Sequence, residues 1–208
     1  SWDKVTSRAI MRLLPDTVIV FNEMVKEERV RCNDVPAARI RVSGIPQYDY
    51  LFTTRHSSRA NFLQTLGIPA GDKLIVFAPF GRAFNNTTWE AIDLLEGMRR
   101  EGAWGGAVSL LVRFQPNDFI EEEEMYRRPG IHFDMPGERF SSERGVDWDM
   151  GEVELAHLRD TLAHLDILVC YASSIAIDAL VFDKPVVNIG FELRSDEPPS
   201  KLPTKHYA

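Results

Sequence analysis

Short apolar runs, rich in β-branched residues, alternate along the chain with segments of helical periodicity. The runs predicted to be strands are 17–21, 40–43, 74–77, 108–114, 131–133, 167–170 and 186–189. The segments predicted to be helices are 22–32, 57–66, 87–101, 152–165 and 174–182, with an acidic helix that begins near Pro116. Strands that are apolar throughout are buried on both faces, and their alternation with helices is typical of parallel sheets. We therefore expect an α/β fold, a Rossmann-like parallel sheet with helices on both faces.

Composition narrows the class of protein. Of the 208 residues, 44% are hydrophobic and 26% are charged, which is ordinary for a globular protein. The formal net charge of −7 argues against nucleic-acid binding, and no apolar run approaches the length of a membrane span. Cys32 and Cys170 are expected to be buried, reduced thiols, which suits a cytoplasmic protein. The chain opens at Ser1 without a Met and closes at Ala208 without a terminal helix, so we expect a fragment of a longer protein.

The loops that follow the predicted strands are the candidate ligand sites, because parallel α/β sheets bind ligands beyond the carboxyl ends of their strands. These loops contain Gly44 and the segments 79–83, 115–118, 137–142 and 171–174. The chain has no dinucleotide-binding glycine pattern, no P-loop and no G-x-S-x-G nucleophile elbow. These absences exclude three common motifs and leave the loops to be judged residue by residue.

Two serines fall where the helix after the strand 167–170 begins. The hydroxyls of Ser173 and Ser174 would lie beside unpaired backbone N–H groups, an arrangement that favours a phosphate. Asp178 follows one turn later on the same face and can accept hydrogen bonds from ribose or sugar hydroxyls. An alternative stays open, in which Ser173 only caps the helix and Asp178 faces water.

Arg113 is unusual because it stands near the end of an apolar strand. A guanidinium there costs desolvation free energy unless it meets an anion. That anion is either a ligand phosphate or a carboxylate such as Asp118, and the sequence does not choose between them. Arg82, in the loop after the preceding strand, is a weaker candidate for the same role.

Several other polar groups have a simpler interpretation. His157, Asp160 and His164 have the spacing of metal ligands on one helix face, but we favour a solvated face. Asn85 and Asn86 begin glycosylation sequons, yet they are better interpreted as helix-capping residues. The segment 87–90 has the spacing of a capping box, and the run of glutamates at 121–124 is expected to be solvated.

Three segments resemble a known family: 17–49 with its V-S-G-I-P turn, LLVRFQPND at 110–118, and ASSIAIDALVFDKPVVNIG at 172–190. The chain resembles the nucleotide-sugar glycosyltransferases of the two-domain GT-B type. Within them it is most similar to the group that contains the CDP-glycerol glycerophosphotransferases. This resemblance implies that 1–66 is the end of an N-terminal domain with the interdomain connection, and that 67–208 is a donor-binding Rossmann-like domain, truncated at its C-terminus.

The resemblance also implies a donor site. The residues expected to bind a nucleotide-sugar or CDP-polyol donor are Gly44, Gly81, Arg82, Arg113, Ser173, Ser174 and Asp178. No metal and no cofactor are expected, because a helix N-terminus and an arginine can stabilise the leaving diphosphate. The catalytic base is expected in the missing N-terminal domain, so the fragment alone should be inactive. The acceptor is unknown, and any peripheral membrane association of the cytoplasmic protein would come through that missing domain.

One residue departs from the family pattern. Where the family often has His, this chain has Gln115, which can donate a hydrogen bond but cannot carry a charge or shuttle a proton. This puts an acidic or cationic role at that position in doubt. Two rival functions therefore stay open: a UDP-sugar 2-epimerase or hydrolase on the same fold, and a non-catalytic binding domain.

Overall fold

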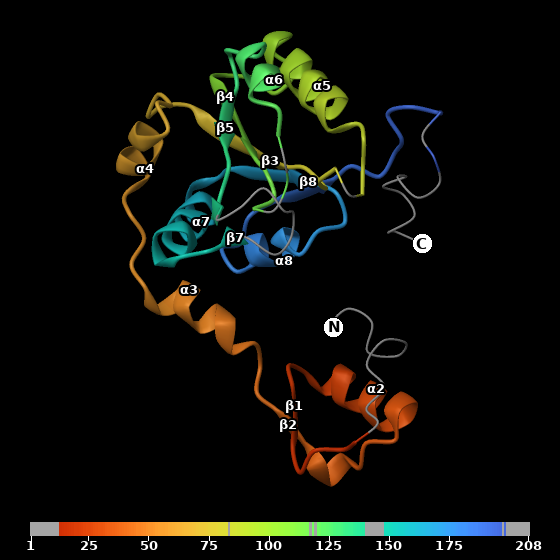
Figure 1. Cartoon of the computed structure of the whole chain (residues 1–208). Coiled ribbons are helices and arrows are strands. Elements are labelled where there is room, and N and C mark those ends of the chain that lie inside the picture. Colours follow the sequence, from red (N-terminus) through yellow and green to blue (C-terminus); the bar gives the residue numbers. More distant parts are fainter. Residues whose placement is uncertain are drawn as a thin grey trace. The chain divides into compact units, whose positions relative to one another are not determined.

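The computed structural model describes residues 13–82, 84–116, 118, 120–139, 148–196 and 198. The chain forms two compact units, Ser1–Arg55 and His56–Ala208, which we describe separately (Figure 1). The sequence placed the division at residue 66, whereas the structure groups the helix at 59–65 with the second unit. The reason is packing: Phe62 and Leu63 of this helix are 3% and 0% exposed in the core of that unit.

The first unit is a strand–helix–strand element. Strands β1 (Val18–Val20) and β2 (Ile40–Val42) pair in parallel, and helix α2 (Glu23–Asn33) connects them, followed by the short 3-10 helix η1 (Ala37–Arg39). Asn22 begins α2 by accepting a hydrogen bond from a backbone N–H in its first turn at 2.8 Å. The core of this unit consists of Val18, Val20, Val25, Val35 and Ile40.

One segment of the first unit differs from the prediction. The sequence predicts a loop at 45–49, but the structure has the 3-10 helix η2 (Pro46–Tyr48), which leads into α3 (Asp49–Thr53). Proline at the first position of a helix costs no hydrogen bond, because the N–H at that position has no partner within the helix. Pro46 therefore begins a helical segment here and does not mark a loop.

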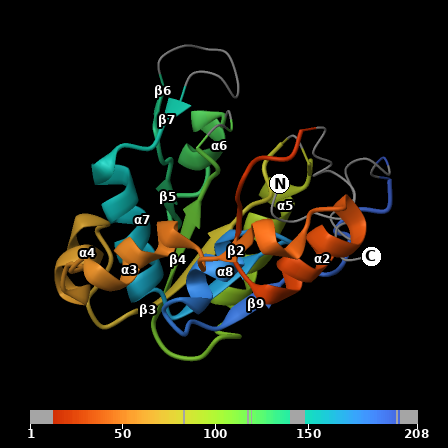
Figure 2. The same cartoon turned by 90° about the horizontal axis from the view of Figure 1, so that it is seen from below.

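Five parallel strands form the sheet of the second unit, in the order β5-β4-β3-β8-β9. Their bounds are β3 (Lys73–Ala78), β4 (Val108–Arg113), β5 (His132–Asp134), β8 (Ile167–Cys170) and β9 (Val186–Asn188). The central strands β3 and β4 are buried over nearly their whole length. Strands β6 (Glu138–Arg139) and β7 (Trp148–Asp149) form a separate antiparallel pair (Figure 2). The predicted parallel sheet is therefore confirmed.

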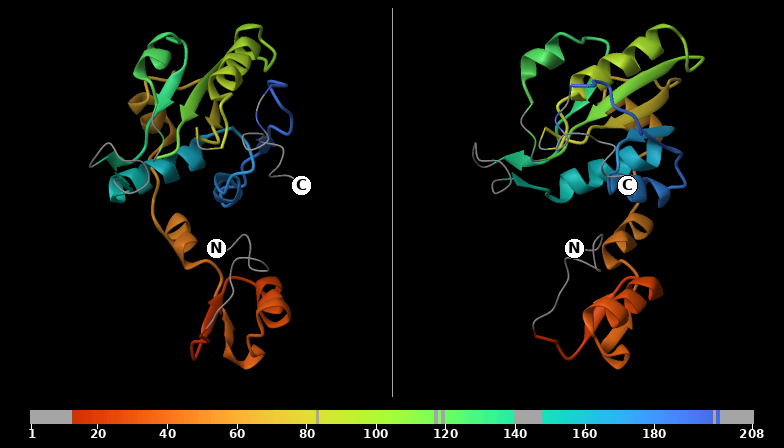
Figure 3. Two further views of the ribbon diagram at one scale, coloured as in Figure 1. Left: turned by 45° about the vertical axis from the view of Figure 1, so that its right-hand side comes forward. Right: turned by 90° about the vertical axis from the view of Figure 1, so that its right-hand side faces the viewer.

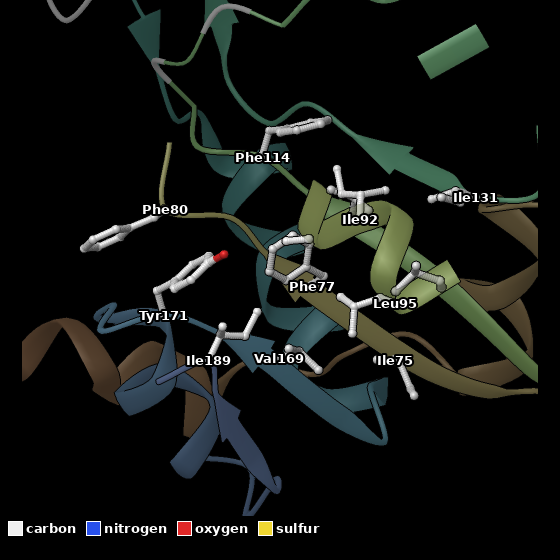
Figure 4. Packing of buried hydrophobic residues seen from close by; sticks show 13 residues of the cluster. Ile75, Phe77, Phe80, Ile92, Leu95, Phe114, Ile131, Val169, Tyr171 and Ile189 are labelled. Atoms are coloured by element: carbon white, nitrogen blue, oxygen red, sulfur yellow. The ribbon is translucent and has the colours of Figure 1, made fainter. Parts of the chain in front are cut away.

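Helices cover both faces of this sheet (Figure 3). On one face lie α5 (Thr88–Arg100) and α6 (Glu122–Tyr126); on the other lie α4 (Arg59–Thr65), α7 (Glu152–His164) and α8 (Ile175–Leu180). Figure 4 shows the core on the face covered by α5. Ile92 and Leu95 of this helix belong to the same cluster as Ile75 and Phe77 of β3. None of the helices in the described part of the chain is both long and apolar enough to cross a membrane.

The leucines spaced along α7 differ in burial. Leu162 and Leu165 are 1% and 0% exposed in the core beneath the sheet, whereas Leu155 is 37% exposed. Only the C-terminal half of α7 therefore packs in the way that its helical periodicity predicts.

Candidate functional site

Loops of the second unit meet at one edge of its sheet. They follow β3, β4 and β8, and because these strands are parallel, their carboxyl ends lie at the same edge. From β3 the sheet extends through β4 and β5 on one side and through β8 and β9 on the other. The strand order therefore reverses between β3 and β8, which is where open α/β sheets bind ligands.

Gly81 brings the loop after β3 against the loop after β4. Its φ of +84° suits glycine, and a Cβ there would lie 2.5 Å from Oε1 of Gln115. The buried carboxylate of Asp118, 4% exposed, accepts a hydrogen bond from the backbone N–H of Arg82 at 3.0 Å. Asp118 therefore holds this turn in place and does not form the ion pair with Arg113 that the sequence offered.

The side chain of Arg82 forms an exposed ion pair. Its Nη1 lies 2.8 Å from Oε1 of Glu121, and the two side chains are 52% and 53% exposed. Exposed pairs of this kind contribute about 0–1 kcal/mol to stability. This pair by itself therefore adds little to stability. Glu121 itself is paired with an arginine, in addition to being solvated as predicted.

Arg113 is buried and paired. Its side chain is 4% exposed and forms an ion pair with Asp134, its register partner at the end of β5. The same oxygen, Oδ2 of Asp134, lies 3.0 Å from Nε2 of His157 in α7. Burial raises the pKa of Asp134, but the hydrogen bond with His157 and the charge of Arg113 outweigh it and hold this pKa below its usual value. The structure thus shows pairing with a carboxylate, and that carboxylate is Asp134.

Ser173 and Ser174 lie between β8 and α8. Ser174 is the N-cap residue of α8 and is exposed, and its side chain makes no capping hydrogen bond. The backbone N–H of Asp178 bonds to the C=O of Ser174 at 3.2 Å, which places Asp178 one turn along the helix, as predicted. Helix α8 has six residues and is shorter than the predicted 174–182, so its dipole is small. An anion at this position would be held mainly by the two hydroxyls.

Two aromatic rings link the loops after β3 and β8. Phe80 and Tyr171 stack with ring centroids 5.7 Å apart and an interplanar angle of 29°. Figure 4 shows the two rings side by side, and they are 8% and 0% exposed. Because Phe80 precedes Gly81 and Tyr171 closely precedes Ser173, this contact fixes the spacing of the loops on either side of the strand reversal.

Six of the seven predicted donor-binding residues belong to the second unit, on or beside the loops at this edge. Gly44 lies in the first unit after β2, with a φ of +75° and no atom within 4 Å of a Cβ built on it. Part of the candidate loop 137–142, residues 140–142, lies outside the described residues. The described geometry therefore concerns the loops after β3, β4 and β8.

The start of α5 differs from the predicted capping box. Thr87 is the N-cap residue, but its side chain makes no capping hydrogen bond. Its hydroxyl and its backbone N–H both donate to Oδ1 of Asn85, at 3.0 and 2.6 Å, while Glu90 pairs with Arg194. The hydroxyl of Thr87 is therefore committed to Asn85. The helix-capping role predicted for Asn85 is therefore wrong, because Thr87 is the N-cap residue and Asn85 accepts from Thr87 before the helix begins.

The polar face of α7 contacts other elements, which corrects the predicted solvated face. Besides the contact of His157 with Asp134, a carboxylate oxygen of Asp160 accepts from the backbone N–H of Ser57 at 3.3 Å, and Nε2 of His164 lies 2.6 Å from the Ser57 carbonyl oxygen. The segment before α4 docks on this face, so it is not open to water. No group of three or more potential metal ligands occurs among the described residues.

The two cysteines differ in burial. Cys170 is buried, and burial raises its pKa to about 11. Cys32 is exposed on α2, contrary to the expectation of two buried thiols, because it lies on the side of this helix away from the small core of the first unit.

Two residues at this edge do not stand out in the sequence as site residues. Asp134 directly follows a predicted strand, and this position at a strand end is the only signal that the sequence offers for it. Asn85 was assigned only a capping role, and no signal in the sequence shows that its amide is buried at this edge, 1% exposed.

A comparison with protein families decides the assignment. The model of the CDP-glycerol:poly(glycerophosphate) glycerophosphotransferase family matches residues 11–195. The chain belongs to this family. The resemblance inferred from the sequence is thereby confirmed, while comparison with curated protein sequences gives no significant match.

Solved structures resemble this glycerophosphotransferase-family chain in fold. The UDP-GlcNAc 2-epimerase from Neisseria meningitidis bound to UDP-GlcNAc is 14% identical, with a TM-score of 0.57 over 83% of this chain and 44% of that one. MnaA from S. aureus with UDP is 15% identical, with a TM-score of 0.53 over 88% and 43%. A variant of the wall teichoic acid polymerase TagF is 17% identical, with a TM-score of 0.51 over 92% and 42%. These likenesses confirm the GT-B type of fold, and the chain spans less than half the length of each protein.

Proposed function

We propose that this chain is the donor-binding part of a transferase. The enzyme would move glycerol phosphate, or a related polyol-phosphate or glycosyl group, from a nucleotide-diphosphate donor to an acceptor. The observation that carries the proposal is the family match over 11–195, together with polar and cationic residues on the loops that flank the strand reversal. The proposal covers donor binding only. The acceptor-binding site and the catalytic base of the whole enzyme would lie outside these loops.

The chemistry of the edge is consistent with this role. Transfer from a nucleotide diphosphate builds negative charge on the leaving phosphate as the bond to phosphorus or carbon breaks, and fixed donors stabilise that charge. Arg82 offers an exposed guanidinium, and Ser173 and Ser174 offer hydroxyls across the strand reversal. Asp178 would accept hydrogen bonds from donor hydroxyls. Arg113 would act at longer range, because its own charge is already paired with Asp134.

Two rival functions have observations in their favour. The fold likeness to UDP-GlcNAc 2-epimerases favours an epimerase or hydrolase, which would turn over a UDP-sugar without an acceptor. Gln115, which lies against Gly81 where the family often has His, favours a domain that binds the donor without catalysis. Family membership over most of the chain favours the transferase over both.

The test is nucleotide binding by the purified protein. We would measure melting temperatures and calorimetric affinities with CDP, UDP, GDP and ADP, for the wild type and for Arg82→Ala and Ser174→Ala. A ligand that binds the folded state raises its stability by about 2.7 kcal/mol at a hundredfold excess over Kd. Loss of a charge-assisted hydrogen bond should weaken binding about tenfold or more in Arg82→Ala.

The matched control is Arg100→Ala, an exposed arginine in the last turn of α5, which should leave affinity unchanged. Preference for CDP, lost in Arg82→Ala and kept in Arg100→Ala, supports the proposal. Turnover of UDP-GlcNAc without an acceptor would replace it with the epimerase. Binding of no nucleotide by the full polypeptide would contradict the donor-site assignment.

A further inference from the structure

Asn85 occupies an unusual position at the start of α5. The residue is 1% exposed, and its Oδ1 accepts hydrogen bonds from both the backbone N–H and the hydroxyl of Thr87. Its own backbone N–H donates to the carbonyl of Gly81 at 3.1 Å. The loop after β3 thus turns back on itself and holds the Asn85 amide just before Thr87, the N-cap residue of a helix that has 13 residues.

Two buried polar atoms of this turn lack a partner. Nδ2 of Asn85 makes no hydrogen bond within the described part of the chain, and neither does Oγ1 of Thr88, whose residue is 6% exposed. The assignment of the Asn85 amide is fixed by its contacts, because only an oxygen can accept from both groups of Thr87. A buried donor without an acceptor costs free energy, so an acceptor atom is expected at this position.

The unpartnered groups of this turn are hydrogen-bond donors, so an anion is the acceptor that suits them. The Asn85 amide nitrogen is only a donor, the Thr88 hydroxyl can donate, and the first backbone N–H groups of a helix are donors without partners in the helix. The positive end of the α5 dipole adds to this preference. The nearest acidic residue in the same turn, Glu90, is paired with Arg194 at 3.3 Å.

The turn lies at the same edge of the sheet as the candidate donor site. It follows β3, the strand that borders the reversal of strand order, and it is hydrogen-bonded to Gly81. The neighbour of Gly81, Arg82, is a proposed donor contact. Helices α5 and α8 approach this edge from opposite faces of the sheet. A diphosphate at the strand reversal therefore has a second set of donors on the face covered by α5, besides Ser173 and Ser174.

We propose that the start of α5 is a second anion-binding point, at which Nδ2 of Asn85 and Oγ1 of Thr88 donate to an oxygen of a phosphoryl group. The inference rests on the proposed function, because it assigns this point to one phosphate of the same diphosphate donor. The phosphate farther from the nucleoside is the one assigned to α5. The phosphate nearer the nucleoside is left with Ser173 and Ser174.

The substitution Asn85→Asp separates the binding role from the structural one. Aspartate keeps an oxygen that accepts from Thr87, and the helix N-terminus offsets part of the desolvation cost of its charge, so the fold should be retained. The same change replaces the donor Nδ2 by a negative oxygen that repels a phosphate. We expect a folded protein with a cooperative melting transition and an affinity for CDP lowered at least about tenfold. The affinity for CMP, which has no second phosphate, should stay near the wild-type value.

Two further variants complete the experiment. Asn22→Asp makes the same chemical change at the start of α2, where Oδ1 of Asn22 accepts from a backbone N–H at 2.8 Å, and it should not alter affinity. Thr88→Val removes only the hydroxyl and should weaken CDP binding several-fold, which decides the matter if Asn85→Asp does not fold. Inorganic pyrophosphate is tested beside CDP, and the variants should rank in the same order of affinity for both ligands.

The outcomes distinguish this inference from the proposed function. Wild-type CDP affinity in both Asn85→Asp and Thr88→Val, with weakened binding in Arg82→Ala, would overturn the second anion point and leave the donor site standing. The orphaned atoms would then be partners of a buried water. Absence of CDP and pyrophosphate binding by the wild type would overturn both.

Discussion

At the residue scale, Gly81 constrains the candidate site through its backbone. We predict that Gly81→Ala destabilises the protein by about 1–2 kcal/mol, because a residue with a Cβ pays that cost in the left-handed region that a φ of +84° requires. The new Cβ would also displace the Gln115 side chain, which lies 2.5 Å away. Urea unfolding of the two proteins at neutral pH measures the difference.

Gly97 provides the matched control for this substitution. It lies inside α5, and a Cβ built on it meets no atom within 4 Å. Alanine is favoured over glycine within helices, so Gly97→Ala should raise stability by about 0.4–1 kcal/mol. Equal effects of the two substitutions would show that the backbone at Gly81 is not constrained as described.

The sequence around Arg113 predicts that this residue needs an anionic partner, but it does not identify the partner. Its place in an apolar strand predicts that it must meet an anion, and it does. The sequence could not choose between a ligand and a carboxylate, because Asp134 is 21 positions away along the chain. The pairing of β4 with β5, which sets Arg113 opposite Asp134, made the choice.

At the scale of elements, Asp166 joins three segments at the start of β8. Its carboxylate accepts from the backbone N–H of Leu74 at 2.8 Å, from Arg59 at 2.7 Å and from Lys73 at 3.2 Å. Burial raises the pKa of Asp166, but the hydrogen bonds from Leu74, Arg59 and Lys73 outweigh it and lower this pKa. The carboxylate therefore connects β8 with β3 and α4.

The lowered pKa gives a pH-dependent prediction. The ionised Asp166 stabilises the fold above the pKa of an unfolded aspartate, about 4, and this stabilisation is lost as the pH falls through the lower folded-state value. Asp166→Asn should therefore cost about 1–2 kcal/mol at pH 7 and progressively less toward pH 3. Urea unfolding at several pH values tests this. Asp16→Asn, which changes an exposed carboxylate of the first unit, should leave stability nearly unchanged at each pH.

The elements themselves were mostly predictable. Every strand of the five-stranded sheet lies within or next to an apolar run found in the sequence, because buried parallel strands need apolar side chains on both faces. The short helix α3 was missed, since its residues carry no helical period long enough to detect. The capping of α5 was assigned to Thr87, yet its hydroxyl is taken by Asn85.

At the scale of the whole molecule, the two units differ in what holds them together. The second unit has two buried clusters around a five-stranded sheet, whereas the first has one small cluster on a two-stranded parallel pair. A two-stranded sheet is marginal on its own in water. The chain between the units is exposed at Arg55.

This difference predicts the result of limited proteolysis. Trypsin should cut early after Arg55 and leave a resistant fragment that begins at His56, while the first unit is degraded. Mass spectrometry of a digestion time course identifies the fragments. Survival of 13–55, with faster loss of the second unit, would contradict the stability order inferred from the two cores.

The sequence by itself determined the class of fold, the order of its strands along the chain, the family and the loops that carry the candidate site. These follow from local apolar patterns and short motifs, which act through neighbouring residues. Only the tertiary structure decided which charges meet: Arg113 with Asp134, Arg82 with Glu121, and the α7 histidines with other elements. Those contacts join residues far apart in sequence, so strand register and helix packing select the partners among many chemically equivalent ones. The same packing buried the Asn85 amide at the start of α5.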